Sequence, residues 1–469
     1  MTKAVVDIET DSLNATKIHC IVAKHYYSNQ ERCWIGDECK DFANWSKGIS
    51  EFVMHNGISF DAPVLNRLTG SNIKLNQIRD TLIESQLYNP IRDGGHSLES
   101  WGERLNYNKG NFTEFSEYSD NMLEYCKRDV ELTRRLSVKL QEEGKNFSSQ
   151  AYEIERKVRS IVDKQQQNGF ALNIKEAMLL QAELLDEQYN LERQADETFP
   201  PKEIQLKTKV KYVPFNIASR KQIAERLIEK GWKPDKHTDK GNIIVSEEVL
   251  SKIKDIPEAE MFSRYFLLQK RTGLLKSWIQ ECQEDERVRG KVLTLRTVTG
   301  RMAHHGPNMA QVPAIYSPYG KECRSLWTVS NTDTHSLVGT DASGLEIRCL
   351  AHYMDNAKFT DIVLSGDVHT ANQQAAGLKT RDQAKTFIYA FLYGAGAAKI
   401  GKIVGGDADV GQRLISKFLS NMSALKVLRE NIQERIKDHD TIRGLDGRML
   451  YIRSPHAALN TLIQGAGAI

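Results

Sequence analysis

The stretch SLVGTDASGLEIRCLAHYM at Ser336–Met354 decides how the rest of the chain is interpreted. Leu337 and Val338 lead to Asp341, a pattern that predicts an apolar strand ending in a carboxylate. Small residues follow, and apolar residues then recur at helical spacing from Leu345, which predicts a tight turn and a helix. A carboxylate at the tip of a strand can hold Mg²⁺ against a triphosphate, although such an aspartate is more often a turn residue or a helix cap.

A second stretch, which reads TRDQAKTFIYAFLYGAG from Thr380 onward, predicts a helix that starts at a capping box formed by Thr380 and Gln383. Arg381, Lys385 and Tyr389 are spaced four residues apart and therefore share one face of that helix. Two cations and an aromatic ring in a stripe suit a bound triphosphate with a base stacked above it. An ordinary amphipathic helix with a solvated basic edge is the alternative.

Taken together and in this order, DASGLEIRCLAHYM and RDQAKTFIYAFLYGAG resemble motifs A and B of the family A DNA polymerases, the relatives of bacterial DNA polymerase I. The resemblance is strongest to the replicative polymerases of short-tailed bacteriophages. It implies a right-hand polymerase with thumb, palm and fingers, whose substrates are a DNA primer-template and deoxynucleoside triphosphates. It also implies two Mg²⁺ ions per active site, which Mn²⁺ can replace, and action in the cytoplasm of an infected bacterial host.

The bulk composition agrees with a large protein of the aqueous phase. The 469 residues allow three or four domains, and 40% hydrophobic with 27% charged residues is an ordinary soluble composition. We expect no membrane span and no signal peptide, because the sequence has no long apolar run. Seven cysteines without a CxxC pair fit a reduced cytosol and no zinc site.

The charge is unevenly distributed along the chain. Residues 1–147 contain 18 Lys and Arg against 22 Asp and Glu, whereas the remainder contains 46 against 39. A basic body with an acidic N-terminal part is compatible with DNA binding.

The N-terminal stretch AVVDIET predicts a strand on which Asp7 and Glu9 point to the same face, because side chains alternate along a strand. Two buried anions side by side require a compensating cation. Asp61 in HNGISFD and Asp129 in YCKRD add two carboxylates, and Tyr125 lies one helical turn before Asp129. Two metal ions held by such carboxylates can activate a water, neutralise a scissile phosphate and stabilise the leaving 3′ oxygen.

The order of these five residues resembles the DEDD family of 3′–5′ exonucleases, in its tyrosine-containing branch. The resemblance assigns residues 1–147 to an RNase H-like exonuclease domain. The four carboxylates bind the metal ions there, and Tyr125 orients the attacking water. Because none of the five residues is missing, we expect an active proofreading exonuclease. The fold expected for the whole chain is thus a multi-domain one of the α/β and α classes.

The polymerase resemblance divides the rest of the chain. It assigns residues 148–300 to the thumb, 301–360 to the first part of the palm, 361–450 to the fingers and 451–469 to the start of a second palm segment. Helical patterns within the expected thumb run through Gln150–Thr198 with a break near Gly169, through Ser219–Lys230, through Ser246–Lys254 and through Glu258–Glu281.

The connection Phe199–Asn216 in the thumb is short. Some phage relatives insert at this point a sizeable loop that recruits a host thioredoxin. Fewer than twenty residues leave no room for that insertion, so we expect no thioredoxin partner. The lysines of the connection are candidate phosphate contacts, namely Lys202, Lys207, Lys209 and Lys211.

The resemblance also implies roles for single residues of the nucleotide site. Asp341 ligates both metal ions with help from the carbonyl of Ala342. Glu346 blocks a ribose 2′-OH and holds the fingers helix through a tyrosine. His369 binds the triphosphate together with the two cations of the predicted fingers helix, and Lys385 can also protonate the departing pyrophosphate.

The aromatic residue of that helix is a tyrosine, Tyr389, which implies acceptance of dideoxynucleotides because its phenol can replace the contact of the missing 3′-OH. The residues expected to contact DNA are Arg301, His304, Asn308, Gln311, Tyr393, Gly394, His456 and Gln464. For the first four, a role as a cap or turn residue is the alternative.

The stretch Ser454–Ile469 resembles the start of a palm helix, and the sequence then ends. The family continues with a hairpin carrying Val-His-Asp-Glu, whose Asp is the second catalytic carboxylate. Asp438-His439-Asp440 does not replace it, because it lies in a charged stretch before the palm helix. Two-metal nucleotidyl transfer needs both carboxylates. We therefore expect a naturally split polymerase that requires a C-terminal partner chain. A truncated product, and a standalone 3′–5′ exonuclease that uses the remainder to hold DNA, are the alternatives.

Overall fold

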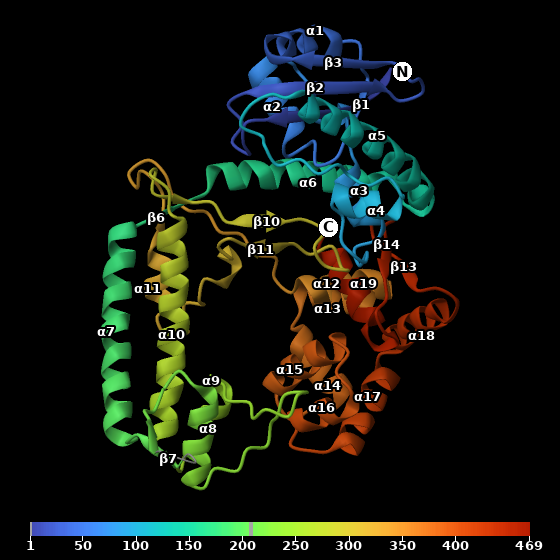
Figure 1. Ribbon diagram of the computed structural model, residues 1–469. Helices are drawn as coiled ribbons and strands as arrows, with labels where there is room; N and C mark the ends of the chain where they lie inside the picture. Colours follow the sequence, from blue (N-terminus) through green and yellow to red (C-terminus); the bar gives the residue numbers. More distant parts are fainter. Residues whose placement is uncertain (1, 206–209) are drawn as a thin grey trace. The chain divides into compact units, whose positions relative to one another are not determined.

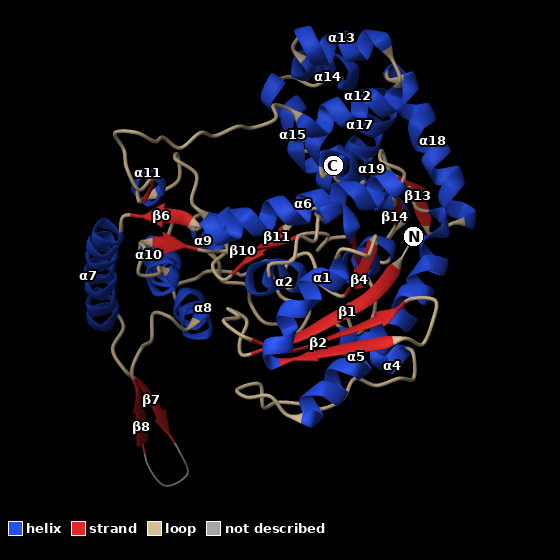
Figure 2. Ribbon diagram, turned by 90° about the horizontal axis from the view of Figure 1, so that it is seen from above, coloured by secondary structure: helices blue, strands red, loops and turns tan. Residues whose placement is uncertain are grey.

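The computed structural model describes residues 2–205 and 210–469, whose helices and strands are drawn in Figures 1 and 2. The chain folds into two compact units. Residues 1–165, 292–303 and 340–469 form the first unit, and residues 166–291 and 304–339 form the second. None of the described helices is long and apolar enough to cross a membrane.

A five-stranded sheet forms the centre of the N-terminal part of the first unit. Its strands are β1 (Lys3–Thr10), β2 (Ile18–His25), β3 (Glu31–Ile35), β4 (Glu51–Met54) and β5 (Ile78–Asp80). They are ordered β3-β2-β1-β4-β5, with β1, β2 and β3 antiparallel and with β4 and β5 parallel to β1. The predicted N-terminal strand is thereby confirmed, and it lies in the middle of the sheet.

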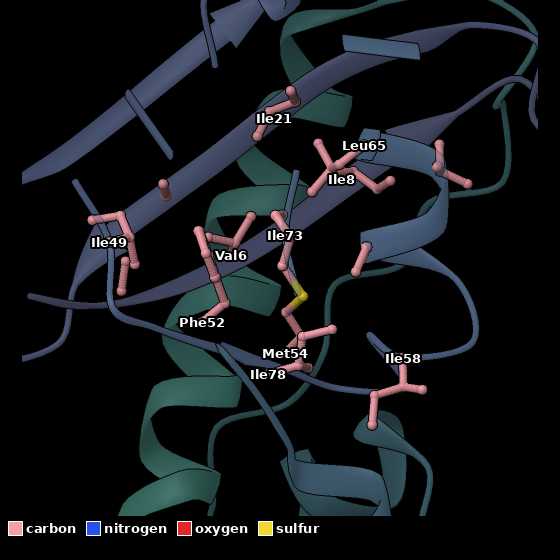
Figure 3. Packing of buried hydrophobic residues seen from close by; sticks show 14 of the residues in the cluster. Val6, Ile8, Ile21, Ile49, Phe52, Met54, Ile58, Leu65, Ile73 and Ile78 are labelled. Atoms are coloured by element: carbon pink, nitrogen blue, oxygen red, sulfur yellow. The ribbon is translucent and has the colours of Figure 1, made fainter. Parts of the chain in front are cut away.

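Helices cover both faces of this sheet. They are α1 (Phe42–Ser46), α2 (Asp61–Thr69), α3 (Thr81–Tyr88), α4 (Leu98–Arg104), α5 (Asp120–Glu143) and α6 (Ser149–Asn168), the last of which ends in the second unit. Val6 and Ile8 of β1 pack into the apolar cluster drawn in Figure 3, together with residues of α1, α2 and α3. Val5 points to the opposite face, where it packs against α5. Since side chains alternate along a strand, Asp7 and Glu9 share the face of Val5 and lie beneath α5.

The C-terminal part of the first unit is mostly helical. Its elements are α12 (Leu345–Met354), α13 (Ala357–Ser365), α14 (Val368–Ala376), α15 (Arg381–Leu392), α16 (Ala397–Ile403), α17 (Ala408–Asn421), α18 (Ser423–Asp438), the hairpin of β13 (Thr441–Arg443) and β14 (Met449–Tyr451), and α19 (Ala458–Gly467). Phe387 and Phe418 are fully buried in its core, and their ring centroids are 5.1 Å apart. Burying one such side chain stabilises the fold by about 1.5–3 kcal/mol.

Arg448 forms a buried ion cluster inside the first unit. Its guanidinium lies 2.7 Å from Glu155 of α6 and 2.7 Å from Asp446. All three side chains are at most 8% exposed. A buried charge is tolerated only when it is paired in this way, so Arg448 fixes the turn of the β13–β14 hairpin against α6.

The second unit is built on two long helices that pack side by side, α7 (Ile174–Thr198) and α10 (Glu258–Glu281) (Figure 1). Its other elements are β6 (Phe170–Leu172), β9 (Arg287–Val288) and β12 (Trp327–Thr328) in one sheet, the hairpin of β7 (Lys202–Gln205) and β8 (Val210–Val213), α8 (Arg220–Glu229), α9 (Glu247–Leu250) and α11 (Gly320–Ser325). β10 (Lys291–Leu293) and β11 (Ala303–His305) pair with each other. The hairpin of β7 and β8 extends away from the helices (Figure 2).

The helices expected in residues 150–281 are confirmed. α6 and α7 are separated at Gly169, where φ is +62°, and α8 starts at the N-cap Ser219. The helix expected at Ser246–Lys254 is shorter than predicted. It is α9, which ends at Leu250. The connection Phe199–Asn216 contains the β7–β8 hairpin.

The prediction of a strand before Asp341 is wrong. Residues 335–342 form no strand, and the side chains of Leu337 and Val338 are 56% and 87% exposed. A strand is stable only when a neighbouring strand satisfies its backbone groups. None of the strands that the structure describes pairs with this segment. The helix expected after it is confirmed as α12.

Candidate active sites

The carboxylates of β1 form the centre of the first candidate site. Asp7, Glu9 and Cys126 of α5 each place one ligand atom within 4.8 Å of the others. Among residues 2–205 and 210–469 this is the one group of three or more His, Cys, Asp or Glu side chains close enough to hold a metal ion together. Cys126 donates its thiol hydrogen to Asp7 Oδ2, with a sulfur–oxygen distance of 3.6 Å. Hard divalent cations prefer oxygen ligands, so the carboxylates are the ligands that such an ion would select.

Asp61 and Asp129 belong to the same electrostatic cluster. Asp61 is the first residue of α2 and Asp129 lies on α5, and both are almost fully buried. Burial and then the charge of Asp7 raise the pKa of Asp61. Asp129 in turn raises the pKa of both Asp7 and Glu9 by its charge. Asp61 and Asp129 therefore lie close enough to interact with Asp7 through their charges, although the group within 4.8 Å contains only Asp7, Glu9 and Cys126.

These carboxyls are strongly destabilised in their charged form. Removal from water, followed by repulsion from the neighbouring carboxylates, raises the pKa of Asp7 to about 7 and that of Glu9 to about 10. Oδ1 of Asp129 is buried and has no hydrogen-bond partner. An orphaned carboxylate oxygen beside protonated carboxyls is the environment that a divalent cation would stabilise. The donor set thus fits Mg²⁺ or Mn²⁺.

Tyr125 packs on the loop that precedes α5. Its ring centroid lies 5.6 Å from that of Phe112 and 6.2 Å from that of Phe115. The same loop carries Lys109, which the sequence did not single out. Lys109 Nζ lies 2.7 Å from Asp129 Oδ2 and 4.9 Å from the centroid of the Tyr125 ring.

The second candidate site lies around α12 and α15. Asp341 and Ala342 are exposed on the segment that forms no strand, and Gly344 with φ +61° turns the chain into α12. Glu346 lies in the first turn of α12 and accepts a hydrogen bond of 3.3 Å from the hydroxyl of Tyr393. The tyrosine that Glu346 contacts is therefore the one directly after α15.

The predicted triphosphate residues lie together. The ring centroids of His369 and Tyr389 are 6.3 Å apart. Partial burial and the positive charges of Arg381 and Lys385 lower the pKa of His369. Asp367, which the sequence did not single out, caps α14 and accepts hydrogen bonds of 2.7 and 3.2 Å from Arg381. Asp367 thus holds the guanidinium of Arg381 in place.

The predicted start of α15 is confirmed in part. Thr380 accepts a hydrogen bond from the backbone of Gln383. The side chain of Gln383, however, accepts from the backbone of Lys379 and not of Thr380. The reciprocal bond of a capping box is thus shifted by one residue.

The predicted DNA contacts fall into two groups. Arg301, Tyr393, Gly394, His456 and Gln464 lie in the first unit, and His304, Asn308 and Gln311 lie in the second. Gly394 has φ +74°, and a Cβ on it would lie 2.6 Å from the carbonyl oxygen of His456. Asn308 caps the 3₁₀ helix Met309–Gln311 and accepts a hydrogen bond from Ala310, which is the capping role that was its alternative.

The lysines of the thumb connection have different surroundings. Lys202 on β7 pairs with Glu229 at 2.6 Å, and Lys211 on β8 is exposed. Lys207 and Lys209 lie outside the described residues.

Comparisons with known proteins match both parts of the chain. A family model described as DNA polymerase family A matches residues 182–468, and one described as 3′–5′ exonuclease matches residues 2–145. The DNA-directed DNA polymerases of Escherichia phage T7 and Enterobacteria phage T3 are each 32% identical, across 99% of this chain and 88% of the phage protein. That of Escherichia phage Phieco32 is 39% identical across 33% of this chain and 28% of its own length.

A solved structure has the same fold. It is the POL domain of Pol1 from M. smegmatis in complex with a DNA primer-template and dNTP. The TM-score is 0.79 and the identity 16%, across all of this chain and 83% of the other. The expected multi-domain fold of the α/β and α classes is therefore confirmed.

Proposed function

We propose that this chain, which belongs to the family A DNA polymerases and carries a 3′–5′ exonuclease domain, is the larger chain of a split phage replicative polymerase. Its proofreading centre is complete. Its synthetic centre takes the second metal-binding carboxylate from a partner chain, and the enzyme works in the cytoplasm of the infected bacterium. The domain boundaries proposed are those expected from the sequence, with the exonuclease at 1–147, the thumb at 148–300, palm segments at 301–360 and 451–469, and the fingers at 361–450.

In the proofreading centre, Asp7, Glu9, Asp61 and Asp129 would hold two Mg²⁺ ions. When bound there, such ions would supply activation of the attacking water and stabilisation of the leaving 3′ oxygen. Tyr125 orients that water through its hydroxyl. The positions of the four carboxylates are fixed, because α2 and α5 pack on the sheet that contains β1.

The observation that carries this assignment is the buried group of carboxylates with raised pKa values. The test is the double variant Asp7→Ala with Glu9→Ala, assayed for removal of a 3′-mismatched nucleotide in Mg²⁺. We expect the removal to be lost. The matched control replaces Glu99 and Glu103, two exposed carboxylates of α4, and keeps it. Retained degradation by the first variant would reject the proofreading centre.

In the synthetic centre, Asp341 and the carbonyl of Ala342 would hold metal ions. His369, Arg381 and Lys385 bind the triphosphate, Lys385 protonates the departing pyrophosphate, and Glu346 excludes a ribose 2′-OH. The solved relative holds a primer-template and dNTP, and we propose the same substrates here. The contacts to DNA are those expected from Arg301, His304, Asn308, Gln311, Tyr393, Gly394, His456 and Gln464.

The need for a partner chain is supported by the surroundings of Asp341. Among the described residues, Asp341 belongs to no group of metal-binding side chains, and its segment pairs with no strand. A partner that adds a hairpin with His-Asp-Glu between apolar runs would supply both the strand and the second carboxylate. Short products of the adjoining reading frames can be searched for this pattern. Adding such a product should switch on primer extension, and Asp341→Asn should switch it off.

Two outcomes would favour other accounts. Nuclease activity without any extension, even with that product, would favour a standalone 3′–5′ exonuclease. We also propose that no thioredoxin takes part, because the connection Phe199–Asn216 is short. Stoichiometric recovery of host thioredoxin in a pull-down would contradict this.

A further inference from the structure

Lys109 lies directly on the proposed proofreading centre. Its ammonium is 2.7 Å from Asp129 Oδ2, and its side chain is 27% exposed whereas that of Asp129 is 3% exposed. Lys109 is thus the more accessible partner of this ion pair, and its side chain can be reached from solvent whereas that of Asp129 is almost fully buried.

The loop around Lys109 is anchored on both sides. Before it, the ring of Tyr107 lies under the guanidinium groups of Arg128 and Arg135, at 4.5 and 4.0 Å. After it, Phe115 places its carbonyl oxygen 3.0 Å from Nε2 of the buried His19. Contacts on both sides fix the backbone, and the ion pair with Asp129 places the ammonium before any ligand binds.

Two glycines allow the loop to come this close. A Cβ on Gly102 of α4 would lie 2.9 Å from the backbone nitrogen of Lys109. A Cβ on Gly110 would lie 3.2 Å from the ring of Tyr125. A side chain at either position would push the loop away from the carboxylates.

Asp129 can serve Lys109 and a metal ion at once. Lys109 takes its Oδ2, whereas Oδ1 is buried and has no hydrogen-bond partner. Lys109 therefore has no need to leave when an ion binds. Four carboxylates and two divalent ions sum to zero charge, which leaves the single negative charge of a phosphodiester without a counterion. Lys109 supplies it.

We propose that Lys109 is a substrate-binding residue of the nuclease, whose ammonium binds a phosphate oxygen of a single-stranded 3′ end. This rests on the proposed nuclease function. Charge-assisted hydrogen bonds are among the strong ones, and losing one lowers affinity by about 10- to 100-fold. Loss of one phosphate contact also reduces the slope of log K against log salt concentration by about 0.7 for a single strand.

The test measures binding of a single-stranded oligonucleotide by fluorescence anisotropy in Ca²⁺, under conditions in which a gel shows no cleavage. We compare Lys109→Met, Lys109→Arg and the control Lys3→Met, which removes another partly exposed ion pair of the same domain, that with Glu51 at 2.7 Å. We expect Lys109→Met to lose both affinity and salt slope. Lys109→Arg should keep the slope, and Lys3→Met should keep both. Matching circular dichroism spectra establish that each variant is folded.

An oligonucleotide with an uncharged methylphosphonate at its 3′-terminal linkage separates charge recognition from other effects. The wild type should bind it more weakly than the phosphodiester, and this difference should be smaller for Lys109→Met. Mn²⁺ binding without DNA is measured by electron paramagnetic resonance. Tighter Mn²⁺ binding by Lys109→Met with unchanged DNA affinity would overturn the proposal, because Lys109 would then only stand in for an ion. Absence of 3′ cleavage by the wild type in Mg²⁺ would instead reject the nuclease function itself.

Discussion

Metal binding to the carboxylate cluster should release protons, and the number follows from the structure. With a pKa of about 7, Asp7 is half protonated at pH 7, and with a pKa of about 10, Glu9 carries almost a full proton. A divalent ion binds only the deprotonated carboxylates. Binding of Mg²⁺ at pH 7 should therefore release about 1.5 protons from this pair.

The sign of the pH dependence follows from the same shifts. Both pKa values are raised, so the metal-free folded protein binds more protons than the unfolded chain. The stability of the metal-free protein is highest below pH 4 as far as these two groups are concerned, and it falls as the pH rises through 7 towards 10. The affinity for Mg²⁺ changes in the opposite direction and should increase more than about tenfold per pH unit near pH 7.

Calorimetric titration of the metal-free protein with Mg²⁺ measures this release when it is repeated in two buffers with different enthalpies of ionisation. Asp7→Asn with Glu9→Gln should abolish it, and Asp341→Asn should leave it unchanged, because Asp341 lies outside the cluster. A binding enthalpy that is independent of the buffer, together with an affinity that is constant from pH 6 to 8, would refute the reasoning.

Four further substitutions test the polymerase part. Arg448→Met leaves two buried carboxylates without a counterion and should lower the free energy of unfolding by about 3–5 kcal/mol. Arg381→Met breaks an exposed ion pair and should leave the free energy of unfolding almost unchanged, so a loss equal to that of Arg448→Met in chemical denaturation would contradict the difference in burial between the two pairs. Phe387→Ala empties a fully buried site and should cost about 3–5 kcal/mol by the same measurement, whereas a loss below about 1 kcal/mol would mean that the site is not packed. In the completed enzyme, Tyr389→Phe should increase discrimination against dideoxynucleotides, and unchanged incorporation ratios would reject the role of its hydroxyl.

Local patterns in the sequence predicted where the side chains of the first candidate site lie on their elements. The period of two along β1 places Asp7 and Glu9 on one face whatever surrounds the strand, and the helical period places Tyr125 one turn before Asp129. Helix ends were predictable where a cap is local, as at Ser219 of α8.

Features that depend on distant partners were missed. The segment at Leu337 has a good strand sequence, yet a strand forms only when another pairs with it, and no local pattern reveals whether one does. Lys109 is separated from Asp129 by a loop without periodicity, and Asp367 reaches Arg381 from another helix. Contacts of this kind are set by tertiary packing and cannot be inferred from residue spacing.

The most direct test of the proposed division between a complete proofreading centre and an incomplete synthetic one is primer extension by this chain alone. The purified protein is given Mg²⁺, all four deoxynucleoside triphosphates and a matched primer-template, and primer length is followed on a gel. A primer that stays the same length or becomes shorter is the predicted result. Robust elongation would contradict the account.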